Sequence, residues 1–120
     1  CSENSVEFTN PKTIQATMGS FCRVKIVYGN ILEYIDNHKD RVSYGMFMDG
    51  NPIDEQHFTQ NDILVIGSES HGISPQVASL IQKRITIPHY HSLPSTAESL
   101  NASIASGILL FEYRKKQPLK

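Results

Sequence analysis

A short loop of glycine and polar residues, residues 67–72, lies between an apolar run at residues 63–66 and a helix signal at Ser74 and Pro75. In α/β proteins, ligands bind at the carboxyl edge of the sheet, where such strand-to-helix loops lie. The two glycines would let the backbone approach a ligand closely. A phosphate-binding loop carries Lys after its second glycine, whereas this chain has Ile73. The loop therefore lacks the charge that a triphosphate needs, and an ordinary strand-to-helix turn is the alternative interpretation.

A second polar cluster, formed by Glu98, Ser99 and Asn101, stands at the start of the last predicted helix. Hydroxyl and amide groups at such a position either cap the helix or contact a ligand. Ser95, three residues before Glu98, also has the spacing of a capping box. Spacing alone favours capping over ligand binding.

Two further groups of residues have the side chains of a metal site and of a hydrolase triad, but we expect neither function. His89 and His91 would share one face of a strand, but no nearby Cys, third His or carboxylate completes a metal site, so a surface loop is favoured. Ser70, His71 and Asp62 contain the groups of a hydrolase triad. Adjacent Ser70 and His71 should point apart, and the sequence has no G-x-S-x-G motif. The sequence therefore predicts neither a metal site nor a hydrolase.

Four short apolar runs alternate with helical patterns and predict strands at residues 23–28, 42–49, 63–66 and 84–87. The run at 63–66 is continuous and rich in β-branched residues, which is typical of a strand buried on both faces. A turn at residues 49–52 would close the second strand. Strands that alternate with helices predict an α/β fold with a mainly parallel sheet flanked by helices.

Capping signals predict where the helices begin. The first would start at Asn10 and Pro11, with an apolar face formed by Ile14, Met18 and Phe21. The second would run from Asn30 to about residue 39, and the third would start at Ser74. The last is predicted over residues 98–116, with an apolar stripe of Leu100, Ile104, Ile108 and Phe111. Small residues between 102 and 107 would permit close packing against another element.

Size, charge and cysteine content exclude several classes of protein. The 120 residues fit a single domain, which we predict over residues 1–120. Eleven basic and twelve acidic residues give a net charge of −1, without the basic field of a stand-alone nucleic-acid binder. Two cysteines are too few for a disulfide framework, and no aliphatic run is long enough to span a membrane. With no signal-peptide pattern at residues 1–5, a cytoplasmic location is expected.

Three segments, residues 66–73, 85–88 and 99–105, together resemble motifs of the SpoU family of RNA 2′-O-ribose methyltransferases, in the SPOUT superfamily. Residues 10–20 and 111–114 are similar to other segments of the family, so the likeness covers nearly the whole chain. The resemblance implies an α/β fold with a C-terminal trefoil knot. It also implies a methyl transfer from S-adenosylmethionine to a ribose 2′-hydroxyl of rRNA or tRNA, with RNA and a second copy of the chain as partners.

The resemblance also assigns roles to individual residues. The positions that match the family's cofactor contacts are Gly67, Gly72, Ile87 and Leu100. The positions that match its polar catalytic pocket are Glu69, Ser99 and Asn101. The missing phosphate-binding lysine agrees with this assignment, since such a loop suits adenosine and methionine better than a triphosphate.

One motif of the family, an Asn followed by Gly-Ala-Ile and an Arg, has no counterpart in the chain, and none of its arginines lies in that context. We therefore expect that the N-terminal part of the family fold is missing and that these 120 residues alone do not methylate RNA. Much of the RNA surface would then lie upstream or on a dimer partner. The alternatives are a knotted module that binds the cofactor without catalysis and a module that serves only dimerisation. Cofactor affinity and methyl transfer separate these alternatives.

Overall fold

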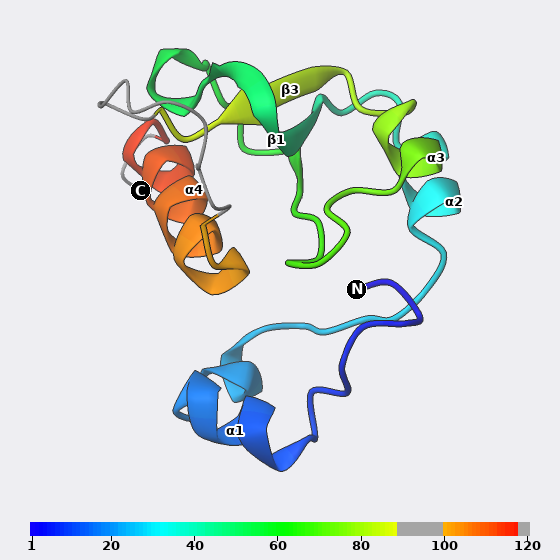
Figure 1. Ribbon diagram of the computed structural model, residues 1–120, viewed down its shortest axis with the longest axis vertical. Helices are drawn as coiled ribbons and strands as arrows, with labels where there is room; N and C mark the ends of the chain where they lie inside the picture. Colours follow the sequence, from blue (N-terminus) through cyan, green and yellow to red (C-terminus); the bar gives the residue numbers. More distant parts are fainter. Residues whose placement is uncertain (89–99, 118–120) are drawn as a thin grey trace. The chain divides into compact units, whose positions relative to one another are not determined.

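The computed structural model describes residues 1–88 and 100–117. The chain forms two compact units, Cys1–Asn37 and His38–Lys120, which we describe separately (Figure 1). The single domain predicted over residues 1–120 stays a prediction.

The first unit holds three short helical elements, α1 (Pro11–Thr17), the 3₁₀ helix η1 (Ser20–Arg23) and α2 (Ile31–Asp36). The predicted caps are confirmed. The Asn10 side chain accepts a hydrogen bond from the Lys12 N–H, and that of Asn30 accepts from Leu32 and Glu33. Each cap satisfies backbone donors that have no partner within the helix.

Two predictions for this unit are wrong. The first helix ends at Thr17, so Met18 adopts a left-handed backbone conformation (φ 49°) and is 90% exposed instead of lining an apolar face. Residues 24–28 form no strand; the nearby bridge between Ser2 and Gly29 is isolated. A strand requires a neighbouring strand that pairs with its backbone N–H and C=O groups. This unit offers residues 24–28 no such partner strand.

The second unit is built on three parallel strands, β1 (Ser43–Pro52), β2 (Ile63–Val65) and β3 (Lys83–Thr86), in the order β2-β1-β3. Ser43 pairs with Ile63, and Tyr44 pairs with Lys83. Between β2 and β3 lies α3 (Pro75–Ala78), whose predicted cap Ser74 accepts from the Val77 N–H. The predicted parallel α/β sheet is confirmed.

The structure corrects two details of this sheet. Residues 63–65 form an edge strand that is only half-buried, whereas the central strand is β1, of which residues 43–45 are buried. Residues 49–52 belong to β1, so they do not end it as a turn. The first error arises because strand order is a property of the assembled sheet, and the apolar content of one run does not encode it. The second arises because Asn51 and Pro52 pair with Ile85 and Thr86 of β3, which are distant in the sequence.

The core of the second unit is aromatic and lies between the sheet and the long helix α4 (Ala102–Lys115), which Figure 1 shows beside β3. Tyr44 and Phe58 have ring centroids 4.7 Å apart, and Phe58 and Tyr113 are 5.6 Å apart. Leu109 of α4 and Ile85 of β3 are fully buried against them. Burial raises the pKa of the Tyr113 hydroxyl. This packing fixes α4 relative to the sheet edge where the site forms.

The buried face of α4 differs from the predicted one. Ala105 and Leu109 are buried, whereas Leu100 before the helix, and Ile104 and Phe111 within it, are exposed. The predicted stripe and the observed face have the same helical spacing but point in different directions. Amphipathic spacing indicates that a helix has faces, and only packing selects the one that meets the sheet.

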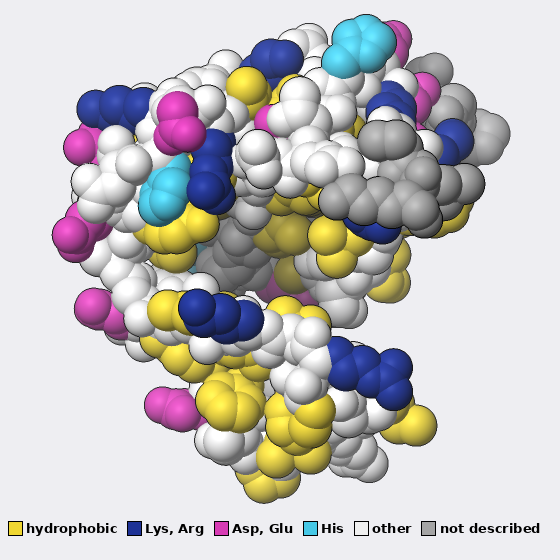
Figure 2. Space-filling view, turned by 180° about the vertical axis from the view of Figure 1, so that it is seen from behind, with side chains coloured by type: hydrophobic (Ala, Val, Ile, Leu, Met, Phe, Trp, Pro, Cys, Tyr) yellow, Lys and Arg dark blue, Asp and Glu magenta, His cyan; other side chains and the backbone are white. Residues whose placement is uncertain are grey.

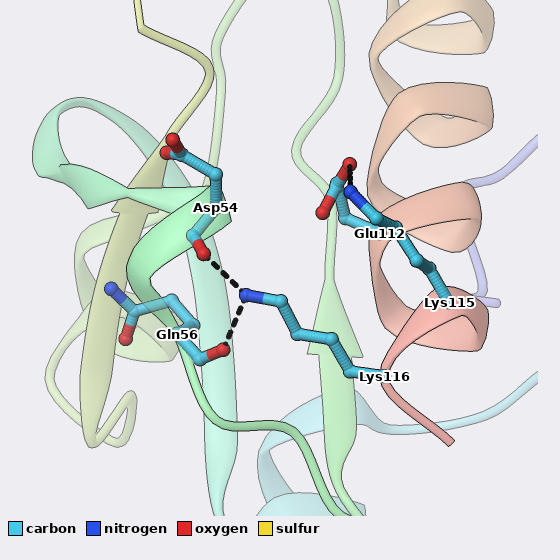
Figure 3. A network of polar contacts seen from close by, with 5 residues as sticks. All are labelled: Asp54, Gln56, Glu112, Lys115 and Lys116. Carbon is cyan, nitrogen blue, oxygen red and sulfur yellow. Dashed lines mark hydrogen bonds and ion pairs between the residues drawn. The ribbon is translucent and has the colours of Figure 1, made fainter. Parts of the chain in front are cut away.

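The end of α4 is attached to the 3₁₀ helix η2 (Ile53–Glu55), which follows β1 (Figure 3). The Lys116 ammonium donates to the carbonyl oxygens of Asp54 (2.5 Å) and Gln56 (2.7 Å). It also lies 5.9 Å from the centroid of the Phe58 ring. Lys115 forms a separate contact with Glu112 within the helix. The lysine thus joins the helix end to carbonyls that follow the central strand.

Among the residues that the structure describes, no helix is long and apolar enough to cross a membrane. The same residues contain no group of His, Cys, Asp or Glu that could hold a metal ion. His89 and His91 lie outside the described residues. Cys1 and Cys22 are both free thiols.

Candidate cofactor site

A cavity of about 390 Å³ lies within the second unit, where β2 and β3 lead into their following loops. Four segments line it: residues 46–48 of β1, residues 66–69 and 71–73 after β2, residues 86–87 at the end of β3, and Leu100, Ala102 and Ala105 around the start of α4. The carboxyl edge of a parallel sheet is where α/β folds place ligands. No Lys or Arg is among the described residues that line it.

The loop after β2 closes on its own backbone. Ser68 and Gly72 exchange two hydrogen bonds, from the Ser68 N–H to the Gly72 carbonyl (3.1 Å) and from the Gly72 N–H to the Ser68 carbonyl (2.9 Å). Gly72 has φ +65°, a conformation that favours glycine. A Cβ atom on Gly67 would lie 2.1 Å from the carbonyl carbon of Gly72. Both glycines are therefore required by the tight closure of this loop.

Glu69, at the tip of this loop, is bonded to the start of α4. Its Oε1 atom accepts from the Asn101 side-chain amide (2.5 Å) and from the Ala102 N–H (3.1 Å). Asn101 in turn caps α4, because its Oδ1 accepts from the N–H groups of Ser103 (3.0 Å) and Ile104 (3.4 Å). A carboxylate is favourable beside the positive end of a helix dipole. The contact ties together two segments that are 32 residues apart in the sequence.

The structure brings most of the residues predicted for the site together. Gly67, Gly72, Ile87 and Leu100 line the cavity, as does Glu69. Asn101 is outside the lining but is hydrogen-bonded to Glu69. Ser99 lies outside the described residues, as do Ser95 and Glu98 of the predicted capping box. In the structure the cap of α4 is Asn101.

A family model described as the SpoU rRNA Methylase family matches residues 1–111. The chain belongs to the SpoU rRNA Methylase family. It is 38% identical over 66 residues to a tRNA (guanosine(18)-2′-O)-methyltransferase of Aquifex aeolicus, an alignment that covers 55% of this chain and 29% of that enzyme. The family therefore includes relatives named for both rRNA and tRNA.

Two solved structures have the same fold as this SpoU chain. One is assigned to the TrmH family of RNA methyltransferases from Porphyromonas gingivalis, with a TM-score of 0.82, 37% identity and coverage of 97% of this chain and 47% of that one. The other is the SpoU methyltransferase AviRb of Streptomyces viridochromogenes in complex with AdoMet, with a TM-score of 0.81, 24% identity and coverage of 97% and 48%. This SpoU chain spans about half the length of these two proteins.

Sequence reasoning missed one wall of the cavity in this SpoU chain. Met46, Phe47 and Met48 of β1 line the cavity, although the sequence pattern predicts only a strand that leads to a turn. The available signal was the pair of glycines that flank the run, Gly45 and Gly50. Glycine inside a strand often marks an irregularity or a close backbone approach.

Another expectation about this SpoU chain is corrected. Ser70 and His71 do not point apart: the Ser70 hydroxyl and the His71 Nδ1 atom lie 2.7 Å from each other. Asp62 does not extend this pair into a triad, because its carboxylate accepts from the N–H (2.6 Å) and hydroxyl (2.6 Å) of Thr59. Two neighbouring side chains can meet at the tip of a tight loop, where the backbone turns sharply.

Proposed function

We propose that the protein binds S-adenosylmethionine in this cavity and transfers its methyl group to a ribose 2′-hydroxyl of rRNA or tRNA. The observation that carries the proposal is the cavity itself, in which the glycine loop of residues 67–72, Ile87 and Leu100 meet at the carboxyl edge of a parallel sheet. Family membership supports it, because relatives in the family are named as RNA methyltransferases.

The described residues fit this cofactor. The cavity of about 390 Å³ lies within the roughly 300–1,000 Å³ of small-molecule sites. Its lining is mostly apolar, which suits an adenine ring and a methionine chain, and it brings a carboxylate, Glu69, near a ligand that carries a sulfonium cation. The absence of Lys and Arg among these lining residues argues against a triphosphate. When bound, the cofactor supplies an electrophilic methyl group on sulfur.

In this proposal the protein contributes mainly by positioning. The backbone of residues 67–72, with Ile87 and Leu100, would hold the cofactor, and the polar pocket of Glu69, Ser99 and Asn101 would orient the ribose hydroxyl. Alignment of two reactants can remove about 7–11 kcal/mol of a reaction barrier. The hydroxyl must also lose its proton, and the family motif assigned to that step has no counterpart in this sequence. We therefore propose that residues 1–120 alone transfer methyl groups slowly at best.

We extend the proposal to the backbone topology and to assembly. The C-terminal part of the chain would form the trefoil knot that the family resemblance implies. A second copy of the chain would pack on the exposed side of α4, where Ile104, Leu110 and Phe111 are exposed and a Cβ atom on Gly107 would meet nothing within 4 Å. Two-fold homodimers are the commonest way to bury such a face. Light scattering should then give twice the monomer mass, and Phe111→Glu should give the monomer mass.

RNA binding would draw on more than this chain's own charges. Figure 2 shows basic side chains interspersed with acidic ones on the face in view, and the net charge is −1. Affinity for a phosphate backbone depends on clustered Lys and Arg. We propose that a dimer partner or segments beyond these residues provide much of that surface.

A second candidate, a module that binds the cofactor without catalysis, is favoured by one observation. Glu69 and Asn101, two of the residues proposed for catalysis, are hydrogen-bonded to each other, and Asn101 also caps α4. These bonds give both side chains a purely structural use. In this version the cavity binds S-adenosylmethionine, but no methyl group reaches RNA.

Titration with S-adenosylhomocysteine, followed by amide NMR and calorimetry, tests the cofactor site. We expect shifts at Gly67, Ile87 and Leu100, and shifts confined to distant elements would contradict the site. Transfer of labelled methyl groups to bulk RNA, assayed with these 120 residues and with a version extended upstream, then separates the two candidates. Activity in the longer version alone supports the enzyme, and there Asn101→Ala should lower the rate. Binding without transfer in either version supports the module.

A further inference from the structure

The central strand β1 leaves the sheet for four residues at the cavity. Met46 and Asn51 are both in register with Ile85 of β3, so residues 47–50 form an excursion from the ladder. The excursion carries Phe47 and Met48, which line the cavity. It ends close to the sheet, because a Cβ atom on Gly50 would lie 2.3 Å from the carbonyl carbon of Ile85. One wall of the cavity is therefore an irregular segment without regular strand pairing.

One side chain of the neighbouring strand, Arg84 of β3, holds this excursion at two points. Its guanidinium carbon lies 3.5 Å from the centroid of the Phe47 ring. Its Nη2 atom donates to Oδ1 of Asp49 at 2.5 Å. The hydrogen bond from Arg84 lowers the pKa of the Asp49 carboxyl. A planar guanidinium can stack on an aromatic face and pair with a carboxylate at the same time, which a lysine cannot do equally well.

These contacts are not positioned to stabilise the fold as a whole. The side chains of Arg84 and Asp49 are 44% and 73% exposed. Exposed ion pairs contribute little to folding free energy, about 0–1 kcal/mol. Arg84 is also outside the cavity lining, so it does not act by touching a ligand there. What its two contacts do constrain is the place of Phe47, which does line the cavity.

We propose that Arg84 is a positioning residue for the cofactor: by stacking on Phe47 and pairing with Asp49 it presets the β1 wall of the cavity. The inference rests on the proposed function, since it assumes that S-adenosylmethionine binds there. Without the contacts of Arg84, residues 47–50 would sample other positions. Ligand binding would then have to fix these residues in place, which would weaken affinity. The predicted consequence is weaker cofactor binding without a loss of fold.

The test compares two variants of the full-length protein. Arg84→Met removes both contacts, and Arg84→Lys keeps the positive charge but lacks the planar guanidinium. Arg23→Met, at an exposed arginine of η1 that does not line the cavity, is the matched control. We expect the Kd for S-adenosylhomocysteine to rise about two- to fivefold in Arg84→Met, with an intermediate rise in Arg84→Lys and none in the control. The thermal midpoint should fall by no more than about 4 °C, the shift that a loss of about 1 kcal/mol gives in a domain of this size. In methyl transfer, KM for the cofactor should rise while kcat holds.

A double-mutant cycle identifies the route of the effect. If Arg84 acts through the Phe47 ring, Arg84→Met should add little to the Kd of a Phe47→Leu protein. An unchanged Kd in Arg84→Met, or strictly additive effects, would overturn the inference while leaving the cofactor site intact. A wild-type protein that does not bind S-adenosylhomocysteine would instead overturn the proposed function, and the inference with it.

Discussion

Two walls of the same cavity are held in place by different means. The loop of residues 67–72 closes on itself through two backbone hydrogen bonds, and its tip is tied to α4 through Glu69. The excursion of residues 47–50 is held from outside, by Arg84 of the neighbouring strand. The first wall depends on glycines at defined positions. The second depends on Gly50 where it approaches β3, and on side chains that meet only when β1 and β3 are in register. Substitution of a glycine should therefore disrupt either wall abruptly, whereas loss of the Arg84 contacts should loosen the second wall gradually.

The largest effect is expected for Gly67→Ala. The new Cβ would lie 2.1 Å from the carbonyl carbon of Gly72, so the loop must open. Forced overpacking costs about 1–3 kcal/mol, and we expect a rise of about 5- to 150-fold in the Kd for S-adenosylhomocysteine measured by calorimetry. Gly29→Ala is the matched control, because a Cβ atom there meets nothing within 4 Å and Gly29 does not line the cavity. It should leave the Kd unchanged. Equal affinity in both variants would show that loop closure does not shape the site.

Gly50→Ala should have the next largest effect and should disturb the second wall, the excursion of residues 47–50. A Cβ at this position would lie 2.3 Å from the carbonyl carbon of Ile85. Because β3 runs beside the central strand, the strain should reach the sheet itself, and we expect a loss of about 1–3 kcal/mol in the free energy of unfolding in urea. If only cofactor affinity falls and stability is unchanged, the excursion moves independently of β3.

Replacement of Glu69 distinguishes a side chain that only holds the loop against α4 from one that takes part in catalysis. Glu69→Gln keeps an oxygen that can accept from Asn101 and Ala102, whereas Glu69→Ala removes it. If Glu69 only positions α4, we expect Glu69→Ala to raise the cofactor Kd about two- to tenfold, and Glu69→Gln to restore it to within about twofold. Amide exchange at Ala102 should rise in Glu69→Ala alone. A catalytic proton acceptor would behave differently, since Glu69→Gln would then slow methyl transfer by about 10²–10⁴-fold at normal affinity.

The smallest effect concerns the charge of Asp49. Its pKa is lowered, chiefly by the hydrogen bond from Arg84, so the pair contributes to stability above the ordinary value of 3.8 and is lost as the pH falls through the lowered value. Between about pH 5 and 8 the pair should not change. An NMR titration of the Asp49 carboxyl should give a midpoint below 3.8 in the wild type and a higher one in Arg84→Met. Equal midpoints would mean that the two groups do not pair in solution.

Short-range sequence signals determined much of the secondary structure of this protein. Asn10, Asn30 and Ser74 cap the helices that they were predicted to cap, because a cap needs only its own side chain and the next backbone N–H groups. Alternation of helix and strand predicted the parallel sheet. The glycine loop was found for a similar reason, since its closure involves residues only four apart in the sequence.

Tertiary structure alone decided the rest. Which strand is central, which face of α4 meets the sheet and whether residues 24–28 form a strand all depend on partners distant in the sequence. The same holds for the contacts of Arg84 with Phe47 and Asp49, which are 37 and 35 residues away from it. Periodicity and capping record the preferences of a segment, whereas burial and pairing depend on the surfaces that other segments offer it. The wall held by Arg84 could therefore be found only in the assembled fold.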